Sequence, residues 1–462
     1  MVRLKVKKTC RLLVVIIGAL VYAFWRQGGD WVDYQTELSA EKWIKEMELV
    51  RMLAEREIHR RGQSNLQTKG RPWYMAGGTV TPSQTAGEES GLWPEQDPGD
   101  DRITNQLMFR PPRLPDVMKP KLKTILLSNG LRTWTGVIRG GDVFSKCPVK
   151  SCKLTLDKSE SRTADAILFK DKFVHPGHSQ INRQVWIMYL LECPYFSRPL
   201  SHTRGTFVNW TATYRRDSEL VTPYAKFVYY DPNVRQLERP LRNYALNKTK
   251  QVAWFVSNCA TPNSRLQYAL ELQKYISVDI FGKCGVMRCP RFFQDMCNEL
   301  LDEDYKFYLA FENANCKDYI TEKFFTNGLM RDILPIVMGA RPEDYLLAAP
   351  EHSYIHVDDF DSPRSLAEFL LLLDKDDERY NSYFRWKGTG EFIDTHFFCR
   401  LCAVLHDDFP EKSYRKPGMW WRGPGICTPG SWRESGPNWA EALPSPKSST
   451  GFGPHFHYKD FL

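Results

Sequence analysis

The sequence predicts an α/β protein with two Rossmann-like domains, carried behind an N-terminal single-pass transmembrane anchor and a flexible stem. Three observations lead to this prediction. Apolar runs of strand length alternate with helical patterns over residues 246–375, which is typical of a parallel sheet with helices on both faces. Further strand patterns precede them over residues 121–245. The first 25 residues combine basic side chains with an apolar run, as expected of a membrane-targeting segment.

Length and composition narrow the class of protein. The 462 residues have room for two or three domains, and a hydrophobic fraction of 42% allows large cores. A net charge of +8 is modest at this length, so a general nucleic-acid-binding protein is disfavoured. The 12 cysteines are many for a cytosolic chain and indicate an oxidising compartment.

The N-terminus has the pattern of a signal anchor. Residues 1–11 carry five Lys and Arg side chains, and residues 12–25 carry no charge. The apolar run is at the lower limit for a spanning helix, and the bulky Phe24 and Trp25 do not form a small-residue cleavage site. We expect a transmembrane anchor over residues 12–25, with a cleaved signal peptide as the alternative. Residues 1–11 are then cytoplasmic and the rest luminal, and a short anchor favours the Golgi membrane.

Residues 26–120 are predicted to form a luminal stem. The charge-rich residues 36–61 have apolar side chains at helical spacing and are expected to form a solvated helix; its self-association, which would give a homodimer, is left open. Residues 62–118 are rich in Gly, Pro, Ser, Thr and Gln and bury too little apolar surface to fold. The first folded domain is therefore expected to begin near Lys121.

The first domain, residues 121–245, has three predicted strands, at 124–127, 166–169 and 185–191. Glu192 follows the last and most apolar of them. Because open α/β sheets bind ligands beyond the carboxyl ends of their strands, a carboxylate at this position is well placed to act. On position alone, however, a structural role at the strand end is the favoured alternative.

The second domain is predicted over residues 246–375, after a proline-containing link at 232–249. Its strands are expected at residues 252–256, 278–281, 308–311, 333–338 and 354–357, and its helices at 263–276 and 363–373. The last helix has clear start signals, with Asp361 or Ser362 as its cap and Pro363 at its first position.

The polar loop between strands 308–311 and 333–338 is the most informative stretch. It leads to a helix that begins near Thr321, with Asp318 as the expected N-cap. The unpaired N–H groups and positive dipole end of such a helix attract anions. Lys323 would suit a diphosphate and Glu322 would suit ribose hydroxyls. The alternative is an ordinary βαβ unit with a Glu-Lys pair on its surface.

This loop closely resembles the nucleotide-sugar signature of the α1,3-fucosyltransferases, glycosyltransferase family 10. The matching residues are Phe311-Glu312-Asn313, Tyr319 and Thr321-Glu322-Lys323. A second match, in the first domain, consists of Asn209-Trp210-Thr211, Tyr214-Arg215 and Asp217-Ser218. The resemblance covers roughly residues 120–410. It is greatest to the branch that fucosylates the innermost, Asn-linked N-acetylglucosamine of N-glycans; a Lewis-type enzyme acting on lactosamine antennae is the alternative.

The resemblance implies a fold of the GT-B type, with the two domains facing a cleft, and inverting transfer of fucose from GDP-fucose to an N-glycan. It implies Glu192 as the general base, although Cys193 stands where a serine is more usual. The residues implied in donor binding are Arg265, on the diphosphate, and Asn313, Tyr319, Glu322 and Lys323. An inactive Golgi glycan-binding protein is an alternative of a different class, which the intact charged residues disfavour.

The cysteines and sequons bear on the luminal prediction. Cys147, Cys152, Cys399 and Cys402 have a spacing that suits either disulfides or a structural zinc site. The family closes its C-terminal cysteine pair onto the N-terminal domain, so bridges between the 147/152 and 399/402 pairs are predicted. The other luminal cysteines are odd in number, which leaves at least one thiol free or bonded to another chain. In the lumen, Asn209 and Asn247 would be glycosylated.

No metal site and no required cofactor are predicted. Asp359-x-Asp361 and Asp374-x-Asp376 have the form of a metal motif, but they flank a helix, where acidic residues are common. Cationic side chains on a diphosphate can replace a metal ion; stimulation by Mn²⁺ or Mg²⁺ is left open. The absence of a Gly-x-x-x-x-Gly-Lys-Ser/Thr loop disfavours a P-loop kinase.

The C-terminal part is predicted in two segments. Residues 376–410 form a helix-rich return segment that contains the Cys-x-x-Cys pair. Residues 411–462 show no periodicity and are expected to form an irregular tail, whose Trp and Arg side chains would suit sugar contacts without any spacing that requires them.

Overall fold

The computed structural model describes residues 70–82, 91–111, 122–130, 132, 134, 143–181, 183–198, 200, 208–289, 294–407, 412–414 and 416–433. In these residues no helix has both the length and the apolar character needed to cross a bilayer. The predicted cytoplasmic tail, the anchor at 12–25 and the stem helix at 36–61 lie outside the described residues.

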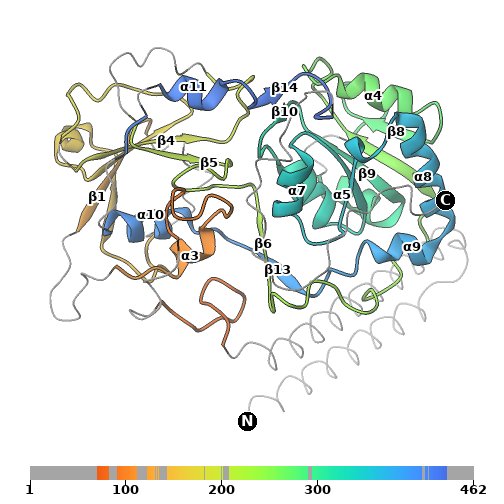
Figure 1. The fold of residues 1–462 in the computed structure, drawn as a ribbon, viewed down its shortest axis with the longest axis horizontal. Helices are drawn as coiled ribbons and strands as arrows, with labels where there is room; N and C mark the ends of the chain where they lie inside the picture. The colour runs from red at the N-terminus through yellow and green to blue at the C-terminus, as the bar shows by residue number, and fades with distance from the viewer. Residues whose placement is uncertain are drawn as a thin grey trace, which may run out of the picture. The chain divides into compact units, whose positions relative to one another are not determined.

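The first half of the described chain is built on a five-stranded parallel sheet (Figure 1). Its strands are β1 (Lys123–Leu127), β2 (Cys152–Thr155), β3 (Ala166–Lys170), β4 (Val185–Leu190) and β5 (Trp210–Thr213), in the order β2-β1-β3-β4-β5, with the short helix η3 (Lys158–Arg162) between β2 and β3. The three predicted strands are present. The two unpredicted ones, β2 and β5, have four residues each, two of which are polar, so neither contains an apolar run.

The second half is built on another five-stranded parallel sheet. Its strands are β7 (Lys250–Phe255), β8 (Val278–Phe281), β9 (Tyr305–Phe311), β11 (Leu334–Met338) and β12 (Ile355–His356), in the order β12-β11-β9-β7-β8. Its helices are α4 (Arg265–Leu272), α5 (Gln294–Glu303), α7 (Pro342–Ala348) and α8 (Pro363–Lys375), with the short helix η6 (Val357–Asp359) after β12. The predicted alternation is confirmed, and Ser362 is the N-cap of α8, one of the two residues predicted for it.

The chain then returns to the first half. α9 (Asp377–Ser382) packs on the second sheet, and α10 (Phe397–Leu405) packs in the core of the first. The helix-rich return segment is thus confirmed for these two helices. Between them, however, lies a strand, β13 (Gly390–Ile393), which pairs antiparallel with β6 (Lys226–Tyr229).

The predicted disulfides between the two cysteine pairs are present, as Cys147–Cys399 and Cys152–Cys402. These bridges leave none of the four sulfurs as a thiolate for a zinc ion. The remaining bridges in the described residues are Cys259–Cys284, Cys289–Cys297 and Cys316–Cys427.

Cys193 is the one free thiol among the cysteines that the structure describes. Its side chain is buried, and burial raises the pKa of the thiol to about 12. Because only a thiolate reacts, we expect no measurable alkylation of native Cys193 by iodoacetamide at about pH 8, and complete alkylation in denaturant without reductant. Peptide mapping after each treatment measures this. Rapid labelling of the native protein would contradict the buried position.

The prediction that residues 26–120 form a flexible stem is wrong for their C-terminal part. Trp93 and Phe109 belong to the core of the first half, and α3 (Ile103–Leu107) packs beside α10 (Figure 1). The apolar side chains of this segment are few and lie in two short groups, at 92–93 and 103–109, and the helix that covers them comes from residues 397–405. Local composition therefore concealed their burial.

The prediction of an irregular tail over residues 411–462 is wrong for residues 412–414 and 416–433. This segment forms α11 (Pro417–Arg422) and β14 (Cys427–Thr428), and Trp421 is fully buried. β14 pairs antiparallel with β10 (Asn315–Cys316) of the second half. The rest of the predicted tail lies outside the described residues.

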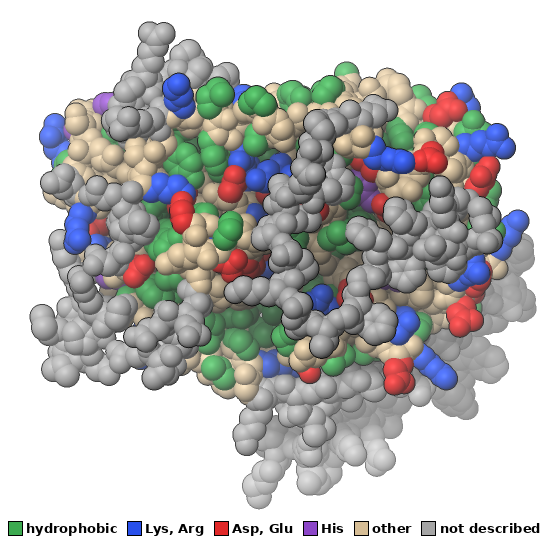
Figure 2. Space-filling model, viewed as in Figure 1, with side chains coloured by type: hydrophobic (Ala, Val, Ile, Leu, Met, Phe, Trp, Pro, Cys, Tyr) green, Lys and Arg blue, Asp and Glu red, His purple; other side chains and the backbone are tan. Residues whose placement is uncertain are grey.

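The face of the molecule in Figure 2 carries charges of both signs. Lys and Arg side chains alternate with Asp and Glu over both halves. A surface that binds nucleic acid through its phosphates instead gathers Lys and Arg on one face or stripe. This face therefore lacks the electrostatic pattern of a nucleic-acid interface among the residues that the structure describes.

Candidate active site

A buried carboxylate organises the polar loop that follows β9. Glu312 is fully buried at the carboxyl end of that strand. Its Oε1 accepts hydrogen bonds from the backbone N–H of Thr321 (2.8 Å) and from the Thr321 hydroxyl (2.9 Å), and Lys323 Nζ lies 3.1 Å from its Oε2. Burial raises the pKa of Glu312, and Lys323 partly offsets this rise. Sequence reasoning gave Glu312 a place in the motif but no role.

The helix start differs from the prediction. Thr321, not Asp318, is the N-cap of α6 (Glu322–Phe324). Asp318 adopts a left-handed backbone with φ of 58° and directs its carboxylate to Arg216. α6 is a single short turn that continues as the π-helix η5 (Phe325–Leu329), so the expected regular helix behind an anion seat is not formed.

Lys323 is a cation held among oxygen atoms. Its Nζ lies 2.8 Å from Thr321 Oγ1 and 3.0 Å from Glu322 Oε1, besides its contact with Glu312. Burial acts to lower the pKa of Lys323, but the two carboxylates outweigh burial and raise it. The side chain is 21% exposed, whereas Glu322 is 53% exposed. These three oxygen atoms engage all three donors of the ammonium, so its predicted contact with a diphosphate would require it to exchange one of them, and that contact stays a prediction.

Glu192 of the first half contacts the same loop. Its Oε1 accepts hydrogen bonds from the Tyr319 hydroxyl (2.9 Å), the Asn313 amide Nδ2 (3.4 Å) and the Cys193 backbone N–H (2.9 Å). These three hydrogen bonds all go to Oε1, and the Glu192 side chain is exposed to solvent. The structure thereby brings the predicted base together with two of the predicted donor-binding residues.

Two tyrosines line this junction. Tyr319 is 2% exposed, and burial together with nearby carboxylates raises the pKa of its hydroxyl, which therefore stays protonated and donates to Glu192. Tyr224 was not predicted. Its hydroxyl donates to the carbonyl of Leu191, the residue before Glu192 (3.0 Å), and its side chain is 37% exposed. Partial burial and then the charges of Glu312, Glu322 and Glu192 raise the pKa of this hydroxyl. No local pattern distinguishes Tyr224 from the other tyrosines.

Arg265 lies at the carboxyl ends of β7 and β9 but is nearly buried. Its Nη1 donates to the Phe311 carbonyl (2.6 Å) and its Nη2 to the Asn258 carbonyl (3.0 Å), while Nε is buried without a hydrogen-bond partner. The guanidinium of Arg265, which was predicted to bind phosphate oxygens, here bonds the chain at the end of β9 and the loop after β7. Its role toward a diphosphate stays a prediction.

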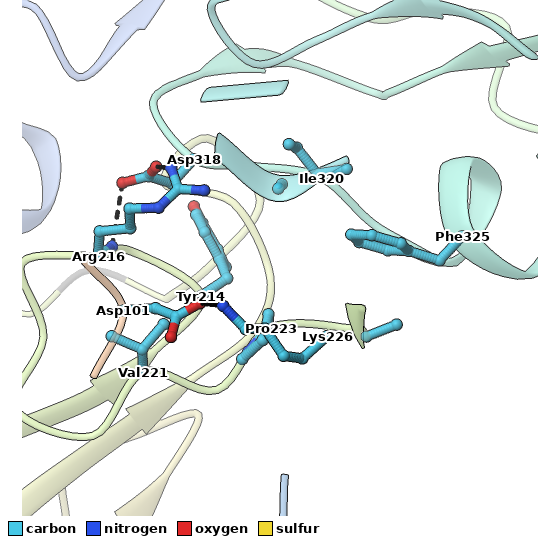
Figure 3. A pocket seen from close by; sticks show the side chains of 11 residues that line it. Asp101, Tyr214, Arg216, Val221, Pro223, Lys226, Asp318, Ile320 and Phe325 are labelled. Carbon is cyan, nitrogen blue, oxygen red and sulfur yellow. Dashed lines mark hydrogen bonds and ion pairs between the residues drawn. The ribbon is translucent and has the colours of Figure 1, made fainter. Parts of the chain in front are cut away.

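An ion pair joins the two halves beside the site (Figure 3). Arg216 Nη1 lies 2.9 Å from Asp318 Oδ1, and the Arg216 backbone N–H donates to Oδ2 (3.0 Å). Burial and then the Asp344 carboxylate raise the pKa of Asp318 to about 7, against the lowering effect of Arg216. The cavity lined by Tyr214, Arg216 and Asp318 measures about 30 Å³, room for a water molecule or two but not for a sugar nucleotide.

The two predicted glycosylation sites have different surroundings. Asn209 Nδ2, the atom that would carry a glycan, donates to the Lys412 carbonyl (3.0 Å), and Asn209 Oδ1 accepts from the Trp186 backbone N–H (2.8 Å). Asn247 is exposed in a turn with φ of 65°. Asn247 thus has the geometry of an accessible acceptor, and occupancy at both positions stays a prediction.

The acidic pairs considered as metal motifs make contacts with the protein itself. Asp361 pairs with Arg433, and Asp374 pairs with Lys306. Asp376 is the N-cap of α9. The absence of a metal site at either pair stays a prediction.

Comparison with known proteins decides the family. An N-terminal fucosyltransferase model matches residues 120–225, and the C-terminal model of glycosyltransferase family 10 (fucosyltransferase) matches residues 245–420. The glycoprotein 3-alpha-L-fucosyltransferase A of Drosophila melanogaster is 57% identical over 353 residues, which is 74% of this chain and 69% of that protein. The chain belongs to glycosyltransferase family 10. It is a fucosyltransferase, and one of the two family models falls on each parallel sheet.

Other relatives of this fucosyltransferase are more distant. An alpha-(1,3)-fucosyltransferase C of Drosophila melanogaster is 35% identical over 60% of this chain and 70% of its own. A human 4-galactosyl-N-acetylglucosaminide 3-alpha-L-fucosyltransferase is 37% identical over 58% of this chain and 74% of its own. A crystal structure of an alpha1,3-fucosyltransferase with GDP-fucose aligns with 68% of this chain and 98% of its own at 15% identity, with a TM-score of 0.41, too low to support an argument.

Proposed function

We propose that this fucosyltransferase transfers L-fucose from GDP-fucose, with inversion, in α1,3 linkage to the innermost, Asn-linked N-acetylglucosamine of N-glycans. The contact of Glu192 with Tyr319 and Asn313 carries the chemical part of this proposal, because it unites residues from both halves around one exposed carboxylate. The 57% identity to a glycoprotein 3-alpha-L-fucosyltransferase supports the acceptor.

In the proposed mechanism, Glu192 Oε2 takes the proton of the acceptor hydroxyl as its oxygen attacks the anomeric carbon. The bond from that carbon to the diphosphate breaks, and Lys323 offsets the charge that develops on departing GDP. Arg265, Asn313, Tyr319 and Glu322 would position the donor where the two halves meet, in the manner of a GT-B cleft. The proposal includes no required metal ion, and assays with and without Mn²⁺ or Mg²⁺ would test for stimulation.

We also place the enzyme in the Golgi membrane, as a single-pass type II protein anchored through residues 12–25 with its catalytic part in the lumen. The five disulfides among the described residues support an oxidising compartment. A glycan on Asn247 would support it further, since only luminal sequons are modified.

The acceptor assignment is tested with the full chain in detergent and labelled GDP-fucose. A core N-glycopeptide and a lactosamine oligosaccharide are offered together. We expect label on the Asn-linked N-acetylglucosamine of the glycopeptide, in a linkage that methylation analysis assigns as α1,3. Label only on lactosamine would favour the second candidate, which the 37% identity to the human enzyme suggests. Glycan binding with no release of GDP would indicate an inactive glycan-binding protein.

A further inference from the structure

The C-terminal segment 412–433, which we call the strap, connects the two loops that form the candidate active site. It runs from the first half, through α11 and β14, to the second half. Its last part lies beyond the region that the family model matches, which ends at residue 420. The proposed mechanism assigns no role to any of its residues.

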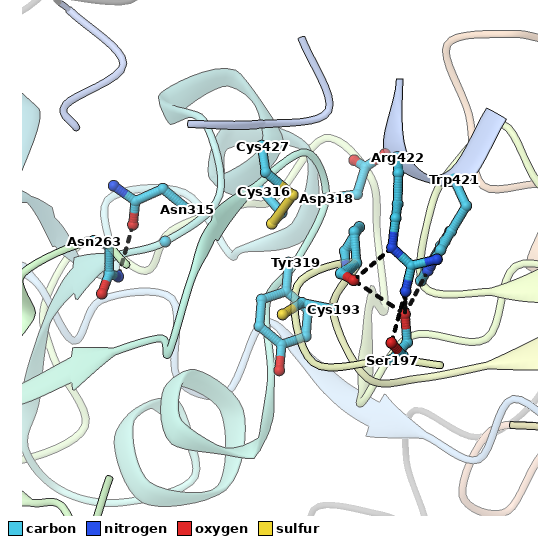
Figure 4. Close-up of a disulfide and its surroundings, with 12 residues drawn as sticks. Cys193, Ser197, Asn263, Asn315, Cys316, Asp318, Tyr319, Trp421, Arg422 and Cys427 are labelled. Carbon is cyan, nitrogen blue, oxygen red and sulfur yellow. Dashed lines mark hydrogen bonds between the residues drawn. A yellow bond between two sulfur atoms is a disulfide. The ribbon is translucent and has the colours of Figure 1, made fainter. Parts of the chain in front are cut away.

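In the first half, the strap holds the turn at residues 193–197, directly after Glu192 (Figure 4). Arg422 Nε donates to the Pro194 carbonyl (3.0 Å), and its Nη2 donates to the Ser197 carbonyl (2.6 Å) and hydroxyl (3.1 Å). Trp421 Nε1 also donates to the Ser197 hydroxyl (2.8 Å). One guanidinium thus fixes both the beginning and the end of this turn.

Two hydrogen bonds connect this turn to Glu192, the predicted base. The Ser197 backbone N–H donates to the Cys193 carbonyl (2.9 Å), which closes the turn. The Cys193 backbone N–H donates in turn to Glu192 Oε1. A displacement of the turn would therefore move the carboxylate that accepts from Tyr319.

In the second half, the strap holds the loop that carries Tyr319. Cys427 is bonded to Cys316, three residues before that tyrosine. The Lys317 backbone N–H donates to the Ile426 carbonyl (2.8 Å), and Asn315 Nδ2 donates to the Gly430 carbonyl (2.9 Å). Only four residues separate Arg422 from Cys427 in the chain, so the two anchor points are joined by a short link.

We propose that the strap positions the general base. Arg422 is the positioning residue, and it keeps Glu192 at the place where the carboxylate accepts the hydrogen bond from Tyr319 of the donor loop. The inference rests on the proposed role of Glu192. Arg422 itself bonds backbone and hydroxyl groups of the turn and is not required to touch substrate. A misplacement of about 1 Å in a reacting group can lower the rate roughly a hundredfold. Loss of the Arg422 side chain should therefore lower kcat much more than it lowers the affinity for the donor.

The experiment compares Arg422→Ala with Arg364→Ala in the full chain in detergent. Arg364 is a matched control, because its side chain is 69% exposed on α8 and pairs with Glu368. We expect Arg422→Ala to lower kcat by roughly tenfold to a hundredfold, with the GDP dissociation constant from calorimetry changed by less than about twofold. The kcat of Arg422→Lys should lie between those of the wild type and Arg422→Ala, since an ammonium lacks the planar fork that reaches both carbonyls.

A double-mutant cycle with Glu192→Gln separates positioning from general stability. Once the base is gone its position is irrelevant, so Arg422→Ala should lower kcat by less than about twofold in the Glu192→Gln background. Equal losses in both backgrounds, or full activity of Arg422→Ala beside an impaired Glu192→Gln, would overturn the inference alone. Full activity of Glu192→Gln would overturn the base assignment and the inference with it.

Discussion

Glu192→Gln is expected to lower kcat by roughly a hundredfold or more while GDP affinity stays nearly unchanged. Glutamine keeps the shape of the side chain and an oxygen that can accept from Tyr319, as Glu192 Oε1 does at 2.9 Å. It cannot take a proton from the acceptor hydroxyl. Steady-state assays with labelled GDP-fucose give kcat, and calorimetry gives the dissociation constant of GDP.

The matched control for this substitution is Glu368→Gln. Glu368 has a side chain that is 53% exposed and pairs with Arg364 on the surface of α8. It should change neither kcat nor GDP affinity. If Glu192→Gln turned over donor and acceptor at the wild-type rate, another group would have to be the base.

Lys323→Ala is expected to have two separable effects. It removes the counter-ion of the buried Glu312, and breaking a buried ion pair from one side costs about 3 kcal/mol of folding free energy or more. The midpoint of thermal unfolding should therefore fall. It also removes the cation proposed to face the diphosphate, so calorimetry should show weaker binding of GDP. Equal GDP affinity in the variant would remove Lys323 from the donor site.

The double variant Lys323→Ala with Glu312→Gln separates these effects. With neither charge present, no buried carboxylate is left unpaired, so the thermal midpoint should recover most of its loss. GDP binding should remain weak, because the cation is still absent. Recovery of GDP affinity together with stability would mean that Lys323 acts on the donor only through the fold.

The site was predictable from the sequence as a set of residues but not as an arrangement. Glu192 and Tyr319 are 127 positions apart in the chain, and no local pattern indicates that one accepts a hydrogen bond from the other. Tyr224 and Arg422 have no motif of their own and were missed for the same reason. Arg265 matched a motif, yet its buried contacts with two carbonyls appear only in the folded chain.

By itself, the sequence determined the α/β class, the alternation over the second sheet and the start of α8, while the family resemblance pointed to Glu192, Asn313 and Tyr319, which the structure brings into contact. These features follow from periodicity, capping and motif chemistry, which act over a few neighbouring residues. Only the tertiary structure decided that residues 91–111 and 412–433 are folded and that Thr321 rather than Asp318 caps α6. It also decided which cysteine pairs with which. Burial depends on partners far along the chain, such as α10 for α3, and composition within a segment does not reveal a partner that lies outside it.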